Sequence, residues 1–95
     1  DLIAERILTL GGTPLHTFEA YVKNNRLPVG HEVSKDEQAI HLILECLPLL
    51  LKIERVILKQ AADIEDEGTN SMMSDFIAEQ EKTIWMLSAW AEQEI

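Results

Sequence analysis

Apolar residues recur at intervals of three and four along most of this chain, which is the period of an α-helix. Residues 1–10 are rich in helix formers and are followed by a glycine pair, which favours the left-handed backbone of a helix C-terminus. Thr17 is a good N-cap for a short helix over residues 18–23, which two asparagines are expected to end. The first third of the chain therefore predicts two short helices, followed by a loop over residues 26–33.

A much longer helix is predicted in the middle of the chain. Ser34 and Glu37 form a capping-box pattern at its start. Apolar positions then continue at helical spacing to about Glu67, where Gly68 is expected to end the helix. Pro48 lies inside this stretch, and because the apolar period continues beyond it, we expect the proline to bend the helix rather than end it.

A second long helix is expected to follow, capped by Thr69 or Asn70 and running to Glu94. The connection between the two long helices is only a few residues, so they should pack as an antiparallel hairpin. No strand pattern competes, and the predicted fold class is all-α. Because the first long helix is apolar over more than half its circumference, a hairpin alone leaves an apolar strip in water, which a missing segment or other subunits should cover.

Composition narrows the classes of function. Asp and Glu total 17 against 8 for Lys and Arg, and the formal net charge of −9 disfavours nucleic acid or anionic lipid and suits cations. Aromatic residues make up only 5%, which disfavours a β-sandwich or barrel. No apolar run approaches the ~20 residues of a membrane span. Cys46 is the one cysteine; it is expected to be a small buried hydrophobe and fits a reducing, cytoplasmic location.

Asp1 and Glu5 are the first candidate metal ligands. Their i, i+4 spacing places two carboxylates on one helix face among apolar neighbours. Hard oxygen ligands of this kind suit iron, manganese, magnesium or calcium. Alternatively, Asp1 is exposed to solvent and Glu5 pairs with Arg6 or with a cation of a partner, and the spacing alone leaves both interpretations open.

Four acidic residues cluster where the first long helix is expected to end: Asp63, Glu65, Asp66 and Glu67. Carboxylates at a helix C-terminus face the negative end of the helix dipole, which is locally unfavourable. A cation-attracting pore assembled from several copies would explain the cluster, and so would a solvated acidic turn kept for solubility.

The histidines add no clear metal motif. Glu37, His41 and Glu45 form an i, i+4, i+8 stripe, which we expect to be solvated surface because no fourth ligand accompanies it. His16 and His31 lie in predicted turns and are expected to be exposed.

Three stretches, in order along the chain, resemble the Dps family, the ferritin-like mini-ferritins of bacteria. Residues 1–14 resemble the family's D-x-x-A-E-R-x-x-x-x-G-G-x-P segment, residues 66–69 its D-E-G-T segment, and residues 81–87 its E-K-x-x-W-M-L segment. The resemblance implies a ferritin-like four-helix bundle with an extra short helix between the second and third. Residues 1–95 would then be a single ferritin-like domain that lacks the first helix and the start of the second.

The resemblance also implies a function. Members of the family form twelve-subunit shells that oxidise Fe(II), usually with hydrogen peroxide, and store the ferric mineral. Their ferroxidase sites lie between two subunits: one supplies histidines and the other supplies a carboxylate pair, which Asp1 and Glu5 match. Asp1 and Glu5 are therefore the implied catalytic and metal-binding residues, with iron as Fe2+ and Fe3+, and the histidines would lie upstream. Asp66 and its acidic neighbours match a position near the family's three-fold channel.

Two points depart from the family's pattern or compete with it. DNA binding in this family usually relies on basic tails, whereas residues 90–95 are acidic, so we expect no direct DNA binding. The proline at position 48 is unusual for the third helix of a bundle. The competing hypothesis is a helical structural or interaction module without a metal site, in which the apolar strip binds a partner helix.

Overall fold

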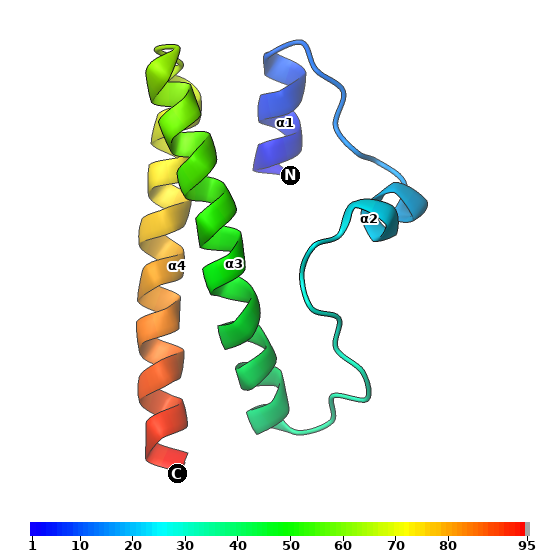
Figure 1. Ribbon diagram of the computed structural model, residues 1–95, viewed down its shortest axis with the longest axis vertical. Helices are drawn as coiled ribbons and strands as arrows, with labels where there is room; N and C mark the ends of the chain where they lie inside the picture. The colour runs from blue at the N-terminus through cyan, green and yellow to red at the C-terminus, as the bar shows by residue number, and fades with distance from the viewer. Residues whose placement is uncertain (95) are drawn as a thin grey trace.

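A computed structural model describes the backbone of residues 1–94, and over that range it contains helices and no strands. The helices are α1 (Leu2–Thr9), α2 (Phe18–Asn24), α3 (Asp36–Asp63) and α4 (Glu67–Glu94). α3 and α4 form an antiparallel hairpin, α1 lies near its closed end, and α2 stands apart from it (Figure 1). The all-α fold class and the hairpin of two long helices are confirmed.

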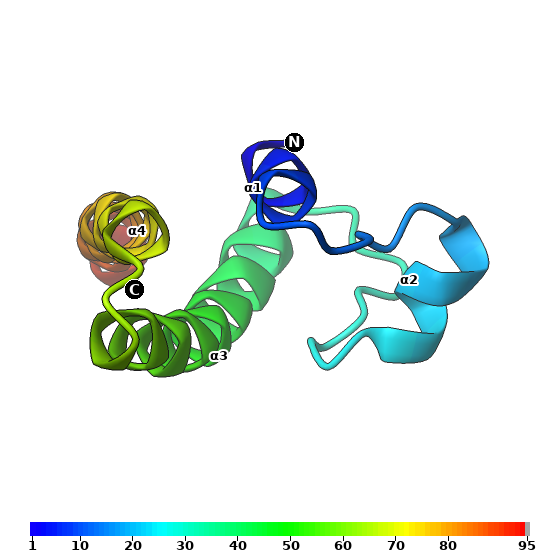
Figure 2. The same cartoon turned by 90° about the horizontal axis from the view of Figure 1, so that it is seen from above.

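α3 continues as one helix through Pro48, as the apolar period predicts (Figure 1). Its 28 residues extend for ~42 Å at the helical rise, which accounts for most of the 46 Å longest dimension of the molecule. Seen from above, the N-terminal half of α3 swings away from α4 (Figure 2). α3 therefore packs against α4 mainly through its C-terminal half (Figure 2).

The start of α3 differs from the capping box that the sequence predicts. The N-cap residue is Lys35, not Ser34. The side chain that reaches back is Gln38, not Glu37: its Oε1 accepts the backbone N–H groups of Ser34 and Lys35 at 3.2 and 3.3 Å. Gln38 takes this role because it stands three residues after the observed cap, which is the position from which a side chain reaches the free N–H groups.

The turn between α3 and α4 lies earlier than predicted. α3 ends at Asp63 rather than near Glu67, and Gly68 lies in the first turn of α4 instead of ending α3. Glu65 takes the left-handed conformation itself, with φ of 60°. The prediction failed because it assigned the reversal to glycine, the residue that adopts this conformation at least cost.

The N-cap of α4 is Asp66, not Thr69 or Asn70. Its Oδ1 accepts the backbone N–H of Thr69 at 3.2 Å, and its carbonyl accepts the N–H of Asn70 at 3.0 Å. An aspartate suits this position because its oxygen satisfies a free N–H group and its charge faces the positive end of the helix dipole.

The two short helices agree closely with the sequence prediction. α1 is followed by Gly11, whose φ of 88° is the left-handed turn expected of a glycine there. Thr17 caps α2, since its Oγ1 accepts the N–H of Ala20 at 3.1 Å. α2 ends at Asn24, one residue later than predicted.

The hydrophobic core of this chain is thin. Among the described residues, the buried apolar side chains are Leu51, Ala61 and Met73. Large apolar side chains on all four helices remain exposed, including Phe18 at 82% and Trp85 at 68%. The uncovered apolar surface that the pattern predicts is therefore present. None of the four described helices is both long and apolar enough to cross a membrane.

Candidate functional site

Asp1 and Glu5 lie at the start of α1, where Asp1 is the N-cap residue and Glu5 belongs to the first turn. The N–H of Glu5 donates to the carbonyl of Asp1 at 2.9 Å, so one helical turn separates the two residues and places them on one face. Both are exposed, and within residues 1–92, whose side chains are described, neither carboxylate takes part in an ion pair. Their oxygens are therefore available as hard ligands for a cation.

Arg6 does not pair with Glu5, which removes one of the alternatives that the spacing left open. Its Nη2 donates to Oδ1 of Asp66 at 2.8 Å, and its Nε donates to Oγ1 of Thr69 at 3.1 Å. The Thr69 hydroxyl in turn donates to Oδ2 of Asp66 at 2.6 Å. These three side chains, which we call the Arg6–Asp66–Thr69 cluster, join α1 to the start of α4.

The cluster is partly shielded from water, with the Arg6 and Asp66 side chains 25% and 19% exposed. The pKa of Asp66 lies below its ordinary value of 3.8. The Thr69 hydroxyl contributes most to this shift, followed by the Thr69 N–H; partial desolvation opposes them, and the Arg6 guanidinium lowers the pKa further. Asp66 is consequently ionised when the pH is near neutral, and hydrogen bonds from Arg6 and Thr69 stabilise its negative charge.

The four acidic candidates surround the α3–α4 turn but differ in their surroundings. Asp63 lies 3.5 Å from the Lys59 ammonium, and both side chains are strongly exposed. Glu65 and Glu67 are also exposed, whereas Asp66 is partly buried and its carboxylate is bound by Arg6 and Thr69 in the cluster. Because α3 ends early, Asp66 and Glu67 belong to the N-terminus of α4, where negative charge is favoured and not opposed.

The other candidates lie at the surface. Glu37, His41 and Glu45 are exposed along α3, as expected of a solvated stripe, and His16 and His31 are exposed in the loops. In the part of the chain that the structure describes, no three side chains of His, Cys, Asp or Glu gather closely enough to hold a metal ion.

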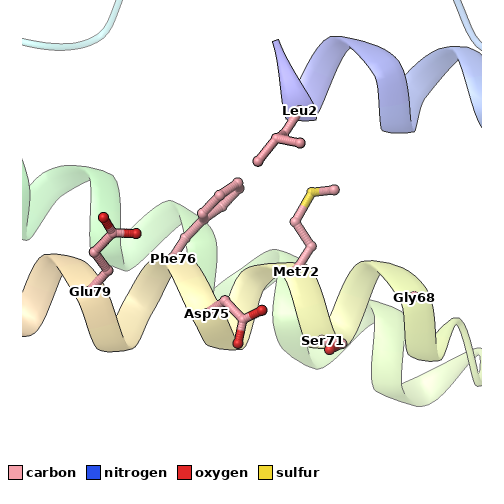
Figure 3. A pocket seen from close by; sticks show the side chains of 7 residues that line it. All are labelled: Leu2, Gly68, Ser71, Met72, Asp75, Phe76 and Glu79. Atoms are coloured by element: carbon pink, nitrogen blue, oxygen red, sulfur yellow. The ribbon is translucent and has the colours of Figure 1, made fainter.

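An open groove separates α1 from α4 (Figure 3). Leu2 points from α1 toward Phe76, and Met72 rises from the preceding turn of α4 on the same side. Asp1 instead lines a different pocket, between α1 and the segment that carries Leu15 and Tyr21. Leu2 and Arg6 therefore form the side of α1 that contacts the hairpin, and Asp1 lies on another side.

The role of Arg6 is not evident from the local sequence pattern. A signal was available, because Arg6 and residues 66–69 belong to two of the three stretches that carry the family resemblance. The structure shows that these two stretches are in contact, although sixty or more residues separate them. A local pattern cannot reveal such a pairing.

A buried carboxylate was missed as well. Glu54 is 4% exposed between α3 and α4, and its Oε2 accepts a hydrogen bond from Nε2 of Gln80 at 2.9 Å. Its position three residues from both Leu51 and Ile57 put it on the apolar face, which was the available signal. Among the described residues, Oε1 of each partner has no hydrogen bond.

Comparisons with known proteins agree with this architecture. The protein-family model described as the ferritin-like domain matches residues 1–94 of this chain. A Haemophilus influenzae protein named only as uncharacterized is 45% identical over 89 residues, which cover 94% of this chain and 56% of that protein. The DNA protection during starvation protein of Porphyromonas gingivalis is 37% identical over 91 residues, covering 96% of this chain and 57% of the relative.

A solved structure gives the same relationship in three dimensions. The crystal structure of the Dps protein from Vibrio cholerae O1, described as a member of a broad superfamily of ferritin-like diiron-carboxylate proteins, superposes with a TM-score of 0.92 at 40% identity. The match covers 95% of this chain and 57% of that one. The chain thus spans little more than half the length of the relatives it matches.

Proposed function

Because this chain belongs to the ferritin-like domain family, and within it to the Dps proteins, we propose that the protein oxidises Fe(II) and stores the iron as a ferric mineral. The observation that carries the proposal is the exposed carboxylate pair of Asp1 and Glu5, one turn apart on α1. Carboxylate oxygens are hard ligands and suit both oxidation states of iron.

In this proposal Asp1 binds one Fe(II) and Glu5 bridges toward a second, while histidines of a neighbouring copy complete the ligand set. Paired negative charge stabilises Fe(III) more than Fe(II), because Coulomb attraction grows with the charge of the cation. Hydrogen peroxide is the proposed oxidant. Two Fe(II) each lose one electron, the O–O bond of one peroxide breaks, and two protons complete two molecules of water. Removing Fe(II) and peroxide together would limit oxidative damage.

The proposal includes a shell of twelve copies. The exposed apolar side chains of this chain support an assembled form, because soluble proteins rarely leave such a large apolar surface in water. Asp63, Glu65 and Glu67 are the proposed residues that draw Fe(II) toward the shell, since they are exposed around one turn of a chain with net charge −9. Asp66 would shape the turn that carries them.

The test compares variants of the assembled full-length protein. Asp1→Ala combined with Glu5→Ala should slow the formation of ferric absorbance after Fe(II) and peroxide are mixed, by about tenfold or more, because ligand oxygens are lost. The matched control is Asp75→Ala combined with Glu79→Ala, an exposed pair of the same residue types and spacing on α4. An unchanged rate in the first variant would contradict the proposal. A small species that leaves iron oxidation at the buffer rate would favour the interaction module.

A further inference from the structure

Glu54 is a charged residue type buried between α3 and α4. It is 4% exposed, the same value as the apolar residues Leu51, Ala61 and Met73. Leu51 and Ala61 lie three and seven residues away along α3, so they share its side of the helix. A carboxylate in such surroundings is costly unless its charge is compensated and its oxygens are hydrogen-bonded.

Within residues 1–92, whose side chains the structure describes, Glu54 takes part in no ion pair. The charged residues that flank Glu54 and Gln80 along their helices are exposed: Lys52 and Arg55 on α3, and Glu79, Glu81 and Lys82 on α4. Arg55 is paired with Glu81 at 3.0 Å, and Arg6 of α1 binds Asp66 and Thr69. An ionised Glu54 would therefore leave an uncompensated charge among apolar side chains.

The hydrogen bonding between Glu54 and Gln80 leaves one oxygen free on each side chain. Nε2 of Gln80 donates to Oε2 of Glu54 at 2.9 Å. Among the described residues, Oε1 of Glu54 and Oε1 of Gln80 have no partner, although both atoms are buried. Buried polar atoms are nearly always hydrogen-bonded. When Glu54 is ionised, both free oxygens are acceptors, so neither satisfies the other.

A group outside the hairpin does not reach these two oxygens while α3 and α4 keep this packing. Each oxygen has almost no accessible surface, so a water molecule or a side chain of a further helix has no room beside it. Packing more helices against the hairpin, as in the ferritin-like bundle of the relatives, buries the two oxygens more deeply. The missing donor therefore has to come from Glu54 and Gln80 themselves.

One proton on Glu54 supplies this donor. A carboxylic acid and a carboxamide form a closed pair when the amide N–H donates to one acid oxygen and the acid O–H donates to the amide oxygen. We propose that Glu54 is protonated and neutral in the folded protein, and that its Oε1–H donates to Oε1 of Gln80. The two side chains then have two mutual hydrogen bonds, no net charge and no free oxygen. This pairing joins α3 to α4 and does not depend on the proposed iron chemistry.

The pairing makes the contact between α3 and α4 dependent on pH. Loss of the proton leaves a buried carboxylate oxygen and an amide oxygen without a donor, which weakens the hairpin. An unfolded chain releases the proton of a glutamic acid at about pH 4.3. Above that pH, folding takes up one proton at Glu54, so this residue's contribution to stability falls as the pH rises.

Infrared difference spectroscopy tests the protonation state directly. The spectrum of the assembled full-length protein at neutral pH is compared with that of Glu54→Gln. We expect the parent to show the C=O stretch of one protonated carboxylic acid per chain, which the variant lacks. The matched control, Glu79→Gln, removes an exposed carboxylate from α4 and should leave this band unchanged. If Glu54→Gln removes only carboxylate bands, the proposal is overturned.

Glu54→Gln should also stabilise the protein at neutral pH. Its amide resembles the protonated acid, because it donates to Gln80 and has no proton to lose. Relative to this variant, the parent's equilibrium constant for folding should fall about tenfold for each pH unit between about pH 5 and neutral pH. Urea denaturation of both assembled proteins at a series of pH values measures the ratio. Equal pH dependence of the two proteins, or a parent that is more stable at neutral pH, contradicts the proposal.

Exchanging the two residues separates the acid–amide pairing from any other role of Glu54. Glu54→Gln combined with Gln80→Glu places the acid on α4 and the amide on α3. A closed pair forms in either arrangement, so the exchanged protein should show the protonated-acid band and the pH dependence of the parent. Loss of the band in the exchanged protein would show that the proton is not shared between these two positions, and the pairing would be wrong.

Discussion

At the residue scale, Asp66 combines three interactions in one side chain. Its Oδ1 accepts the Thr69 N–H and an Arg6 N–H, and its Oδ2 accepts the Thr69 hydroxyl. All three donors favour the ionised carboxylate, so the cap of α4 and the anchor of α1 depend on the same charge. Protonation of this one group should therefore weaken both.

The pH dependence of stability is the first prediction at this scale. Because the folded protein holds the pKa of Asp66 below 3.8, the stabilisation is fully present above that pH and is lost as the pH falls through the lower, folded pKa. In Asp66→Asn, the free energy of unfolding should accordingly fall less steeply below about pH 4 than in the parent. Urea denaturation at a series of acidic pH values measures this slope.

The matched control is Asp75→Asn, which removes an exposed carboxylate elsewhere on α4. It should keep the steep acid dependence of the parent protein. Equal slopes for Asp66→Asn and the parent would show that the cluster does not favour the ionised form.

At the element scale, α3 shows how a helix can continue through proline. Pro48 has no N–H, so the carbonyl one turn earlier, that of Leu44, receives no helical hydrogen bond from it. The helix nevertheless continues because apolar residues on both sides retain the helical period, and Leu51 in the next turn is buried. Tertiary packing therefore outweighs the local cost.

Replacing this proline should stabilise the helix. Pro48→Ala restores an N–H donor and a better helix former, and the greater freedom of the unfolded chain offsets only part of the gain, leaving about 1 to 2 kcal/mol. Chemical denaturation of the assembled protein measures the change. Lys52→Ala, an exposed site one turn later, is the control and should shift stability by much less. A loss of stability in Pro48→Ala would mean that packing around position 48 requires the proline.

At the scale of the whole molecule, the chain is long and thin, with extents of 46 × 30 × 17 Å. A shape with so little depth cannot enclose many side chains, which is why a 46% hydrophobic sequence leaves large apolar groups exposed on every helix. Its charge is predominantly negative, and part of that charge is gathered at the closed end of the hairpin. The exposed apolar groups favour assembly with other polypeptide chains, and the negative charge favours attraction of cations.

The dependence of iron uptake on salt belongs to this scale. If the acidic turn attracts Fe(II), raising the ionic strength should slow uptake into the assembled protein, because salt screens charges over about 10 Å at 0.1 M. Glu65→Gln with Glu67→Gln should slow uptake at low salt and weaken its salt dependence. The control, Glu37→Gln with Glu45→Gln, removes the same charge near the other end of α3. Identical behaviour of the two variants would assign the effect to net charge alone.

Much of the fold was predictable because its causes are local. The helical period, the Thr17 cap and the left-handed glycine after α1 each depend on residues within one or two turns. The errors at the ends of the long helices arose where several polar residues competed for one role: Lys35 replaced Ser34 as the cap, and Asp66 replaced Thr69 or Asn70. Neighbouring candidates differ too little in local propensity for a pattern to choose among them.

The arrangement of the candidate site likewise depends partly on local helical geometry and partly on tertiary packing. The sequence alone determined that Asp1 and Glu5 share a helix face, since that follows from helical geometry. It also determined that the helices carry more apolar surface than an isolated soluble protein exposes, and that the chain is strongly acidic. Only the tertiary structure decided that Arg6 binds Asp66 and Thr69, and not Glu5, because residues about sixty positions apart meet only when the hairpin and α1 are packed together. Helical geometry sets the angle between side chains, whereas packing decides the direction in which the helix presents them.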